Sequence, residues 1–259
     1  MIRFCCSCEN DQQGWCRTHE RKLTECDDAF GSTPSAMARG FYNGAWWQVL
    51  LRGGTKFPPP ASKKVSGLRY TGERVIPESE DVFAHLNYLT HRIEYEAAAT
   101  VLTKDMLVLD CACGVGYGSD ILRRSAGAVI GVDVSDKAIA YAKEKYRAEN
   151  LAFIASDARS LPFDDASFDT VMSIETVEHF PDADKFIAEI HRVLRPGGLL
   201  FMTTPNGEQH PILHDGHHHK HYRKKELSRL IRKKFQHFVI VSNGMNGICW
   251  RVIARKWRR

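Results

Sequence analysis

The chain has 259 residues, of which 43% are hydrophobic and 26% charged, with a mean hydropathy of −0.34. These values are typical of a globular protein with a sizeable core. No apolar run approaches the roughly 18 residues of a membrane-spanning helix, so the sequence excludes a transmembrane protein, as well as a collagen and a wholly disordered chain. The net charge of +5 is uneven, because residues 220–259 carry +12 and residues 1–219 carry −7. The basic segment therefore indicates either contact with an anion, such as RNA, or the solvated face of a helix.

Residues 1–65 differ from the rest in composition and are predicted to be an extension that lacks a regular period. Five of the eight cysteines lie in its first 26 residues: Cys5, Cys6, Cys8, Cys16 and Cys26. The pairs Cys5-x-x-Cys8 and Cys16-x-x-His19 have the ligand types of a small zinc site, while disorder of this extension is the alternative. Because residues 1–9 lack a basic start followed by an apolar core, no secretory leader is predicted, and we expect a reducing, cytoplasmic location.

Downstream of about residue 68, short apolar runs alternate with segments of helical spacing. Helices are predicted over residues 81–102, 119–124, from 135 or 136 to about 148, 183–194 and 224–233. Strands are predicted over residues 107–109, 129–132, 152–154, 170–174, 199–203, 238–242 and 248–254. Alternating strands and helices predict an α/β fold, in which a mostly parallel sheet has helices on both faces.

The strongest motif runs from Val108 to Gly118, reads Val-Leu-Asp-Cys-Ala-Cys-Gly-Val-Gly-Tyr-Gly, and joins a predicted strand to a helix. Small residues at such a turn let the backbone approach a ligand, and helix amides favour acceptor groups. Acids follow three successive strands, namely Asp110, Asp133 and Asp157. A carboxylate after the second strand can accept hydrogen bonds from both ribose hydroxyls of a nucleoside. The spacing differs from the Gly-x-Gly-x-x-Gly fingerprint of NAD-binding proteins.

Together with Phe168-Asp-Thr-Val171 and Arg192-Val-Leu-Arg-Pro-Gly-Gly198, this motif resembles the type 11 subgroup of class I S-adenosylmethionine-dependent methyltransferases. The resemblance implies a Rossmann-like, seven-stranded sheet with an antiparallel last strand. It implies a lid over residues 66–104, like that of sugar- and glycan-modifying members, and a methyltransferase domain over residues 105–259. It also implies that S-adenosylmethionine contacts Asp110, Ala112, Cys113, Gly114, Gly116, Gly118, Asp133, Val134, Asp157, Ala158, Ile174 and Glu175.

The expected reaction transfers a methyl group to a hydroxyl of a small molecule, a sugar or a glycan. His179, after the fourth strand of the predicted domain, is the candidate general base, since imidazole accepts a proton near neutral pH. No metal ligand is assigned, although Glu175, Glu178 and His179 have the chemistry to hold a divalent cation. They resemble a segment of metal-assisted RNA ribose 2′-O-methyltransferases, which remains an alternative function. A non-catalytic regulator that binds S-adenosylmethionine is the alternative of another class.

Overall fold

The computed structural model describes residues 15–16, 21–22, 75–78, 82–210, 217–243 and 247–257, with backbone alone for 15–16, 21–22 and 82–84. The chain divides into two compact units, residues 1–56 and 57–259. In the first unit, β1 (Trp15–Cys16) pairs with β2 (Arg21–Lys22) in an antiparallel ladder. The side chains of the candidate zinc ligands lie outside the described residues.

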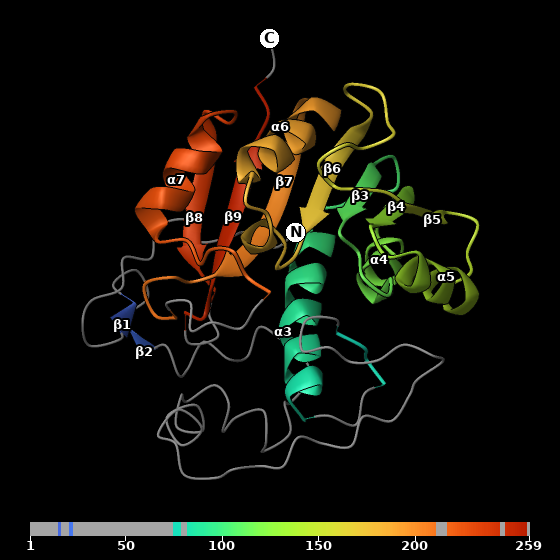
Figure 1. Ribbon diagram of the computed structural model, residues 1–259, viewed down its shortest axis with the longest axis horizontal. Helices are drawn as coiled ribbons and strands as arrows, with labels where there is room; N and C mark the ends of the chain where they lie inside the picture. The colour runs from blue at the N-terminus through green and yellow to red at the C-terminus, as the bar shows by residue number, and fades with distance from the viewer. Residues whose placement is uncertain are drawn as a thin grey trace. The chain divides into compact units, whose positions relative to one another are not determined.

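The second unit is built on a seven-stranded sheet in the order β5-β4-β3-β6-β7-β9-β8. The strands are β3 (Leu107–Cys111), β4 (Ala128–Asp133), β5 (Leu151–Ala155), β6 (Phe168–Ser173), β7 (Leu194–Pro205), β8 (His237–Ser242) and β9 (Cys249–Arg255). Neighbours from β5 to β7 are parallel, whereas β9 is antiparallel to both β7 and β8. The predicted Rossmann-like sheet with an antiparallel last strand is confirmed (Figure 1).

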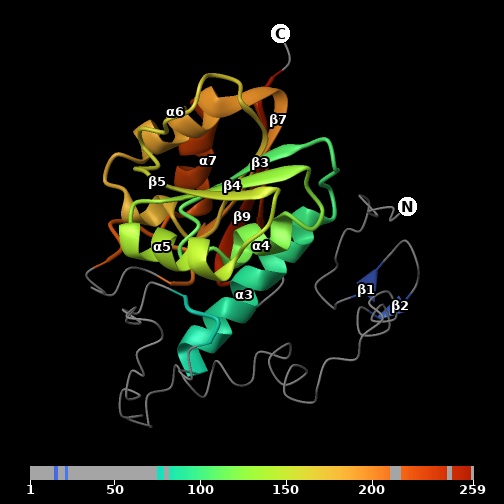
Figure 2. The same cartoon turned by 90° about the vertical axis from the view of Figure 1, so that its right-hand side faces the viewer.

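Helices cover both faces of the sheet, as Figure 2 shows. One face carries α3 (Val82–Ala99), α4 (Tyr117–Leu122) and α5 (Asp136–Lys145), and the other carries α6 (Ala183–Val193) and α7 (Lys224–Arg232). Each of α6 and α7 buries one apolar stripe, which in α7 consists of Leu227, Leu230 and Ile231. This stripe leaves the charged residues of α7 facing away from the core.

The predicted elements are present, with two instructive shifts. The third helix ends at Lys145 rather than near residue 148, because Tyr146 adopts an extended conformation and packs its ring against the core. Strand β7 begins at Leu194, five residues earlier than predicted, and it contains the Pro196-Gly197-Gly198 segment that follows α6. Gly197 has a φ of 86°, a conformation in which glycine avoids steric cost.

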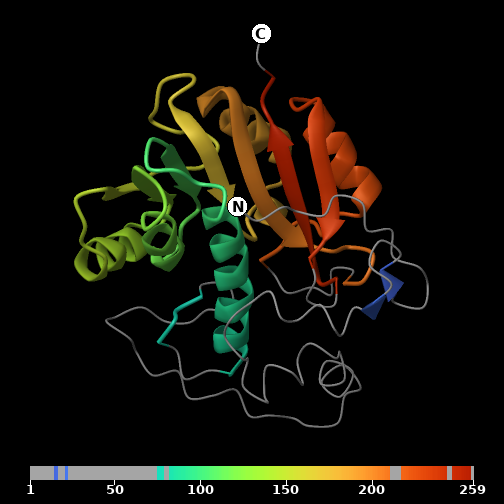
Figure 3. The ribbon, with the colours of Figure 1, turned by 180° about the vertical axis from the view of Figure 1, so that it is seen from behind.

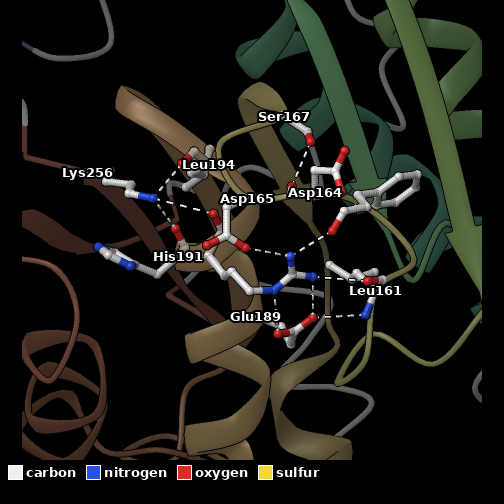
Figure 4. A network of polar contacts seen from close by, with 10 residues as sticks. Leu161, Asp164, Asp165, Ser167, Glu189, His191, Leu194 and Lys256 are labelled. Carbon is white, nitrogen blue, oxygen red and sulfur yellow. Dashed lines mark hydrogen bonds and ion pairs between the residues drawn. The ribbon is translucent and has the colours of Figure 1, made fainter.

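A network of hydrogen bonds and ion pairs surrounds the C-terminal end of α6, where β7 begins. The guanidinium of Arg192 donates to the carbonyl oxygens of Leu161 and Phe163 and to the carboxylates of Asp165 and Glu189 (Figure 4). Nearby, Lys256 Nζ donates to the carbonyls of His191, Arg192 and Leu194. Lys256 thereby satisfies carbonyls that the end of α6 leaves without intrahelical partners, whereas Arg192 attaches the helix to the loop between β5 and β6.

The carboxyl ends of β3, β4 and β6 meet at one edge of the sheet, from which α3 extends in Figure 3. In open α/β sheets, ligands bind outside the carboxyl ends of the strands, at the point where the strand order reverses. That point lies between β3 and β6. Within the described part of the chain, no helix is both long and apolar enough to cross a membrane.

Candidate active site

The loop after β3 has the backbone of a ligand cradle. Ala112, Gly114 and Gly116 have φ values of 64°, 55° and 86°, so the chain repeatedly adopts the left-handed conformation. A Cβ added at Gly114 would meet no atom within 4 Å, whereas one at Gly116 would lie 2.8 Å from Ala142 and Phe153. The loop therefore presses against the core at Gly116 and has open space at Gly114.

Asp110, at the end of β3, is fully buried and supports this loop from below. Its carboxylate accepts hydrogen bonds from Ser119 Oγ at 2.6 Å and from Tyr95 Oη at 3.0 Å. Burial raises the pKa of Asp110 to about 6, although both hydrogen bonds oppose that shift. The ring of Tyr95 fills the place of a side chain at Gly118, where an added Cβ would lie 2.0 Å away. Helix α3 thus contacts the loop through Tyr95.

Asp133, at the end of β4, fixes the other side of the loop. Its carboxylate accepts from the Gly114 amide at 2.9 Å and from the Ser135 amide at 2.8 Å. The side chain is partly exposed, and the next residue, Val134, is 75% exposed. Each carboxylate oxygen has a further lone pair, so Asp133 can still accept from a ligand, with an apolar side chain beside it. Cys113, whose amide donates to the Val132 carbonyl, is buried under the same turn.

Asp157, after β5, is engaged with Arg159. Its oxygens accept from the amide, Nε and Nη2 of Arg159. Hydrogen bonding to Arg159 holds the pKa of Asp157 below its ordinary value. Ala158 is buried. The Asp157 carboxylate therefore stays charged and is held by Arg159.

Ile174 and Glu175 follow β6, and the Glu175 amide donates to the carbonyl oxygen of Thr203 on β7 at 3.2 Å. Ile174 is buried, and Glu175 has a φ of 46°, which is unusual for a residue with a side chain. Oε1 of Glu175 is buried without a hydrogen-bond partner. Burial raises the pKa of Glu175 to about 7, against hydrogen bonds with Thr203 and Cys249. A strained, buried carboxyl at this edge is typical of a functional position.

A second cluster forms next to this edge, where the short helix η3 (Val177–His179) meets the segment before α7. Ligand atoms of Glu178, His179 and His218 lie within 4.8 Å of one another. Glu178 is fully buried, and its Oε2 accepts from Thr204 Oγ1 at 2.8 Å. The Glu178 carbonyl accepts from the amide of His219 at 2.8 Å, which attaches the loop to η3.

The structure therefore groups the predicted residues differently from the sequence. It places Glu178 and His179 with His218, a residue 39 positions further along the chain, and Glu175 is not part of that group. Sequence reasoning did not single out His218. The run His217-His218-His219 and His221 was the available signal, but choosing one member requires the fold.

Residues 109–202 match a family model described as a methyltransferase domain. A probable S-adenosylmethionine-dependent methyltransferase of Mycobacterium tuberculosis is 36% identical over 151 residues, which cover 58% of this chain and 53% of that protein. A fatty-acid O-methyltransferase of Mycolicibacterium smegmatis is 33% identical over 130 residues, or 49% of this chain and 47% of that protein. The chain thus matches about half the length of these relatives.

The solved structure of the [4+2]-cyclase SpnF superposes with a TM-score of 0.55 at 21% identity, covering 65% of this chain and 82% of that one. At this identity the likeness concerns the fold. The cradle after β3 and the carboxylate after β4 both lie within the segment 109–202, which matches the methyltransferase-domain model, and the sheet has the Rossmann-like strand order of that fold.

Proposed function

We propose that this protein is an S-adenosylmethionine-dependent methyltransferase that acts on a hydroxyl of a small molecule, sugar or glycan. The observation that carries the proposal is the pairing of Asp133 with the Gly114 amide, beside the open space at Gly114 and the exposed Val134. This arrangement fits a nucleoside, because the carboxylate can accept from ribose hydroxyls and the valine can pack against the base. When bound, S-adenosylmethionine supplies an activated, positively charged methyl donor.

The residues of the chain then have separate tasks in our proposal. Asp133 and Val134 hold the nucleoside, Asp157 and Ala158 lie at the base, and the loop from Ala112 to Gly118 receives the methionine part. Asp110 keeps this loop in place through Ser119 and Tyr95. Ile174 and Glu175 border the methyl-transfer site, where alignment of acceptor, methyl and sulfur provides most of the acceleration.

His179 is the proposed proton acceptor for the hydroxyl. Its Nδ1 lies 3.2 Å from the His217 carbonyl oxygen. Because a carbonyl oxygen only accepts, Nδ1 carries the proton, and Nε2 of the neutral ring carries the lone pair. The ring is thereby held in the tautomer whose outer nitrogen is basic.

The cofactor assignment is tested by calorimetry with S-adenosylhomocysteine on the full chain and on D133A. We expect D133A to lose about 2 kcal/mol of binding free energy, roughly 30-fold in affinity, because charged hydrogen bonds are lost. D136A is the matched control, since Asp136 is an exposed acid three positions along the chain. Wild-type affinity in D133A would refute the ribose role, and the absence of binding in the folded wild type would refute the cofactor.

The alternative to a methyltransferase is a protein that binds S-adenosylmethionine but transfers no methyl group. A protein of the same fold is described as a [4+2]-cyclase, so the fold alone does not establish methyl transfer. Tight S-adenosylhomocysteine binding with no labelled product from any hydroxyl acceptor would favour a non-catalytic role.

A further inference from the structure

The hydrogen bonds around the Glu178 cluster assign a tautomer to each of three histidines. His221 Nδ1 lies 2.5 Å from the His210 carbonyl oxygen, so Nδ1 carries the proton and Nε2 of the neutral ring is an acceptor. His218 Nδ1 lies 2.7 Å from that Nε2 and must donate to it. The lone pair of neutral His218 is therefore on its own Nε2.

His179 reaches the same state by a different route. Its Nδ1 donates to the His217 carbonyl oxygen, which leaves the lone pair on Nε2. The rings of His179 and His218 are adjacent, with centroids 4.7 Å apart and planes inclined by 61°. In both neighbouring neutral imidazoles, Nδ1 thus donates a hydrogen bond and Nε2 carries the lone pair that a metal ligand needs.

The third member supplies the negative charge. The Glu178 carboxylate is buried, and one of its oxygens is oriented by Thr204 Oγ1. Histidines that bind a metal almost always donate their other N–H to a carbonyl, carboxylate or water, and ligating carboxylates are themselves hydrogen-bonded. All three side chains satisfy that rule, and their ligand atoms lie within 4.8 Å of one another. Atoms that share one cation at about 2.1 Å are at most about 4.2 Å apart, so small side-chain rotations close the site.

We propose that Glu178, His179 and His218 bind a divalent transition-metal cation, and that His221 is a positioning residue that sets the tautomer of His218. Two imidazole nitrogens and one carboxylate oxygen favour Zn²⁺, Co²⁺, Fe²⁺ or Mn²⁺ over Mg²⁺, which prefers oxygen ligands. Within the described residues these three side chains supply the ligand atoms, and in our proposal the acceptor hydroxyl takes a further coordination position, as substrates do in catalytic sites.

This inference rests on the proposed function and refines it. In the metal-bound protein, the Nε2 lone pair of His179 goes to the cation, and the acceptor hydroxyl binds at an open position. The cation lowers the pKa of that hydroxyl, so its proton leaves to water and the oxygen becomes the nucleophile. In the metal-free protein, His179 alone would take the proton.

The test is a titration of the full chain with Co²⁺, followed through its visible absorption, and with Zn²⁺ by calorimetry. Because the cysteines of the first 26 residues can also bind these ions, the measured quantity is the one equivalent that H218Q removes. We expect H218Q to lose that equivalent and H221Q to bind it 10- to 100-fold more weakly, the usual effect of removing such a supporting contact. H219Q is the matched control, because His219 is exposed, belongs to the same loop and is outside the cluster.

Equal stoichiometry in wild type and H218Q would overturn the site, and unchanged affinity in H221Q would overturn the positioning role. S-adenosylhomocysteine binding is measured on every variant. Its retention shows that the variant is folded and keeps a failure of the metal site distinct from a failure of the proposed function. Methyl transfer that is unaffected by a chelator would leave His179 as the base and refute the metal's role in the reaction.

Discussion

At the residue scale, the buried acid Asp110 makes the stability of the protein depend on pH. The pKa of its carboxyl is raised by burial to about 6, so between about pH 4 and pH 6 the folded chain binds a proton that the unfolded chain has released. The contribution of Asp110 to stability is therefore most favourable below pH 4 and declines as the pH rises to about 6. The decline is about 3 kcal/mol, from about 1.4 kcal/mol per pKa unit.

We expect D110N to flatten this dependence, because an amide can keep both hydroxyl contacts without a charge. The measurement is the free energy of urea unfolding at pH 4, 5, 6 and 7. D105N is the control, since Asp105 is exposed and its pKa is lowered by Thr103. If D110N and wild type change in parallel across this range, Asp110 is not the source of the slope.

At the element scale, α3 is attached to the sheet by two consecutive residues. Tyr95 donates to Asp110 on β3, and Glu94 forms a two-point ion pair with Arg251 on β9, with N–O distances of 2.6 and 2.8 Å. Glu94 is buried, so its removal leaves a guanidinium without its partner. The helix that contacts the loop after β3 therefore depends on an ion pair with a residue 157 positions away in sequence.

We expect E94Q to destabilise the protein by about 3 kcal/mol, the usual cost of breaking a buried pair. The free energy of unfolding in urea measures it. E96Q provides the comparison on the same helix, because the Arg92–Glu96 pair is exposed and such pairs contribute at most about 0.5 kcal/mol. Equal losses in the two variants would show that the Glu94–Arg251 pair does not hold α3.

Local pattern was enough to predict most elements, because a buried parallel strand such as Leu107–Cys111 and an amphipathic helix such as α6 have distinct periods. It was not enough for β7, because its start depends on the pair Phe168–Leu194 with β6 and on backbone hydrogen bonds of Gly197 and Gly198 with Lys256, which local pattern does not reveal. In the same way, the acids at the ends of β3, β4 and β5 could be predicted from their strands, whereas His218 could not. Its place beside His179 depends on how the loop before α7 folds back onto η3.

At the scale of the whole molecule, the basic C-terminal part is less available than its charge of +12 suggests. Several of its cations already have partners: Lys220 with Glu226, Lys233 with Asp184, Arg251 with Glu94, and Lys256 with three carbonyls. Lys224 and Arg232 lie over the rings of Trp250 and Phe238. Lys225 and Arg229 are exposed on α7 and are suitable probes of an anionic partner.

We therefore expect the double variant K225E/R229E to transfer labelled methyl groups to small hydroxyl acceptors at the wild-type rate, since both side chains lie on the outer face of α7.

An RNA substrate would behave differently. Each lost phosphate contact reduces the slope of log affinity against log salt by about 0.9 for a duplex, and about 0.7 for a single strand, and two reversed charges would weaken binding strongly. The measurement is labelled-methyl transfer to sugars, phenols and RNA at two salt concentrations, with K225Q/R229Q separating loss of charge from reversal. Methylation of RNA by the wild type that is abolished in K225E/R229E, with sugars and phenols unmodified, would overturn the small-molecule proposal and establish this face of α7 as the RNA-binding surface.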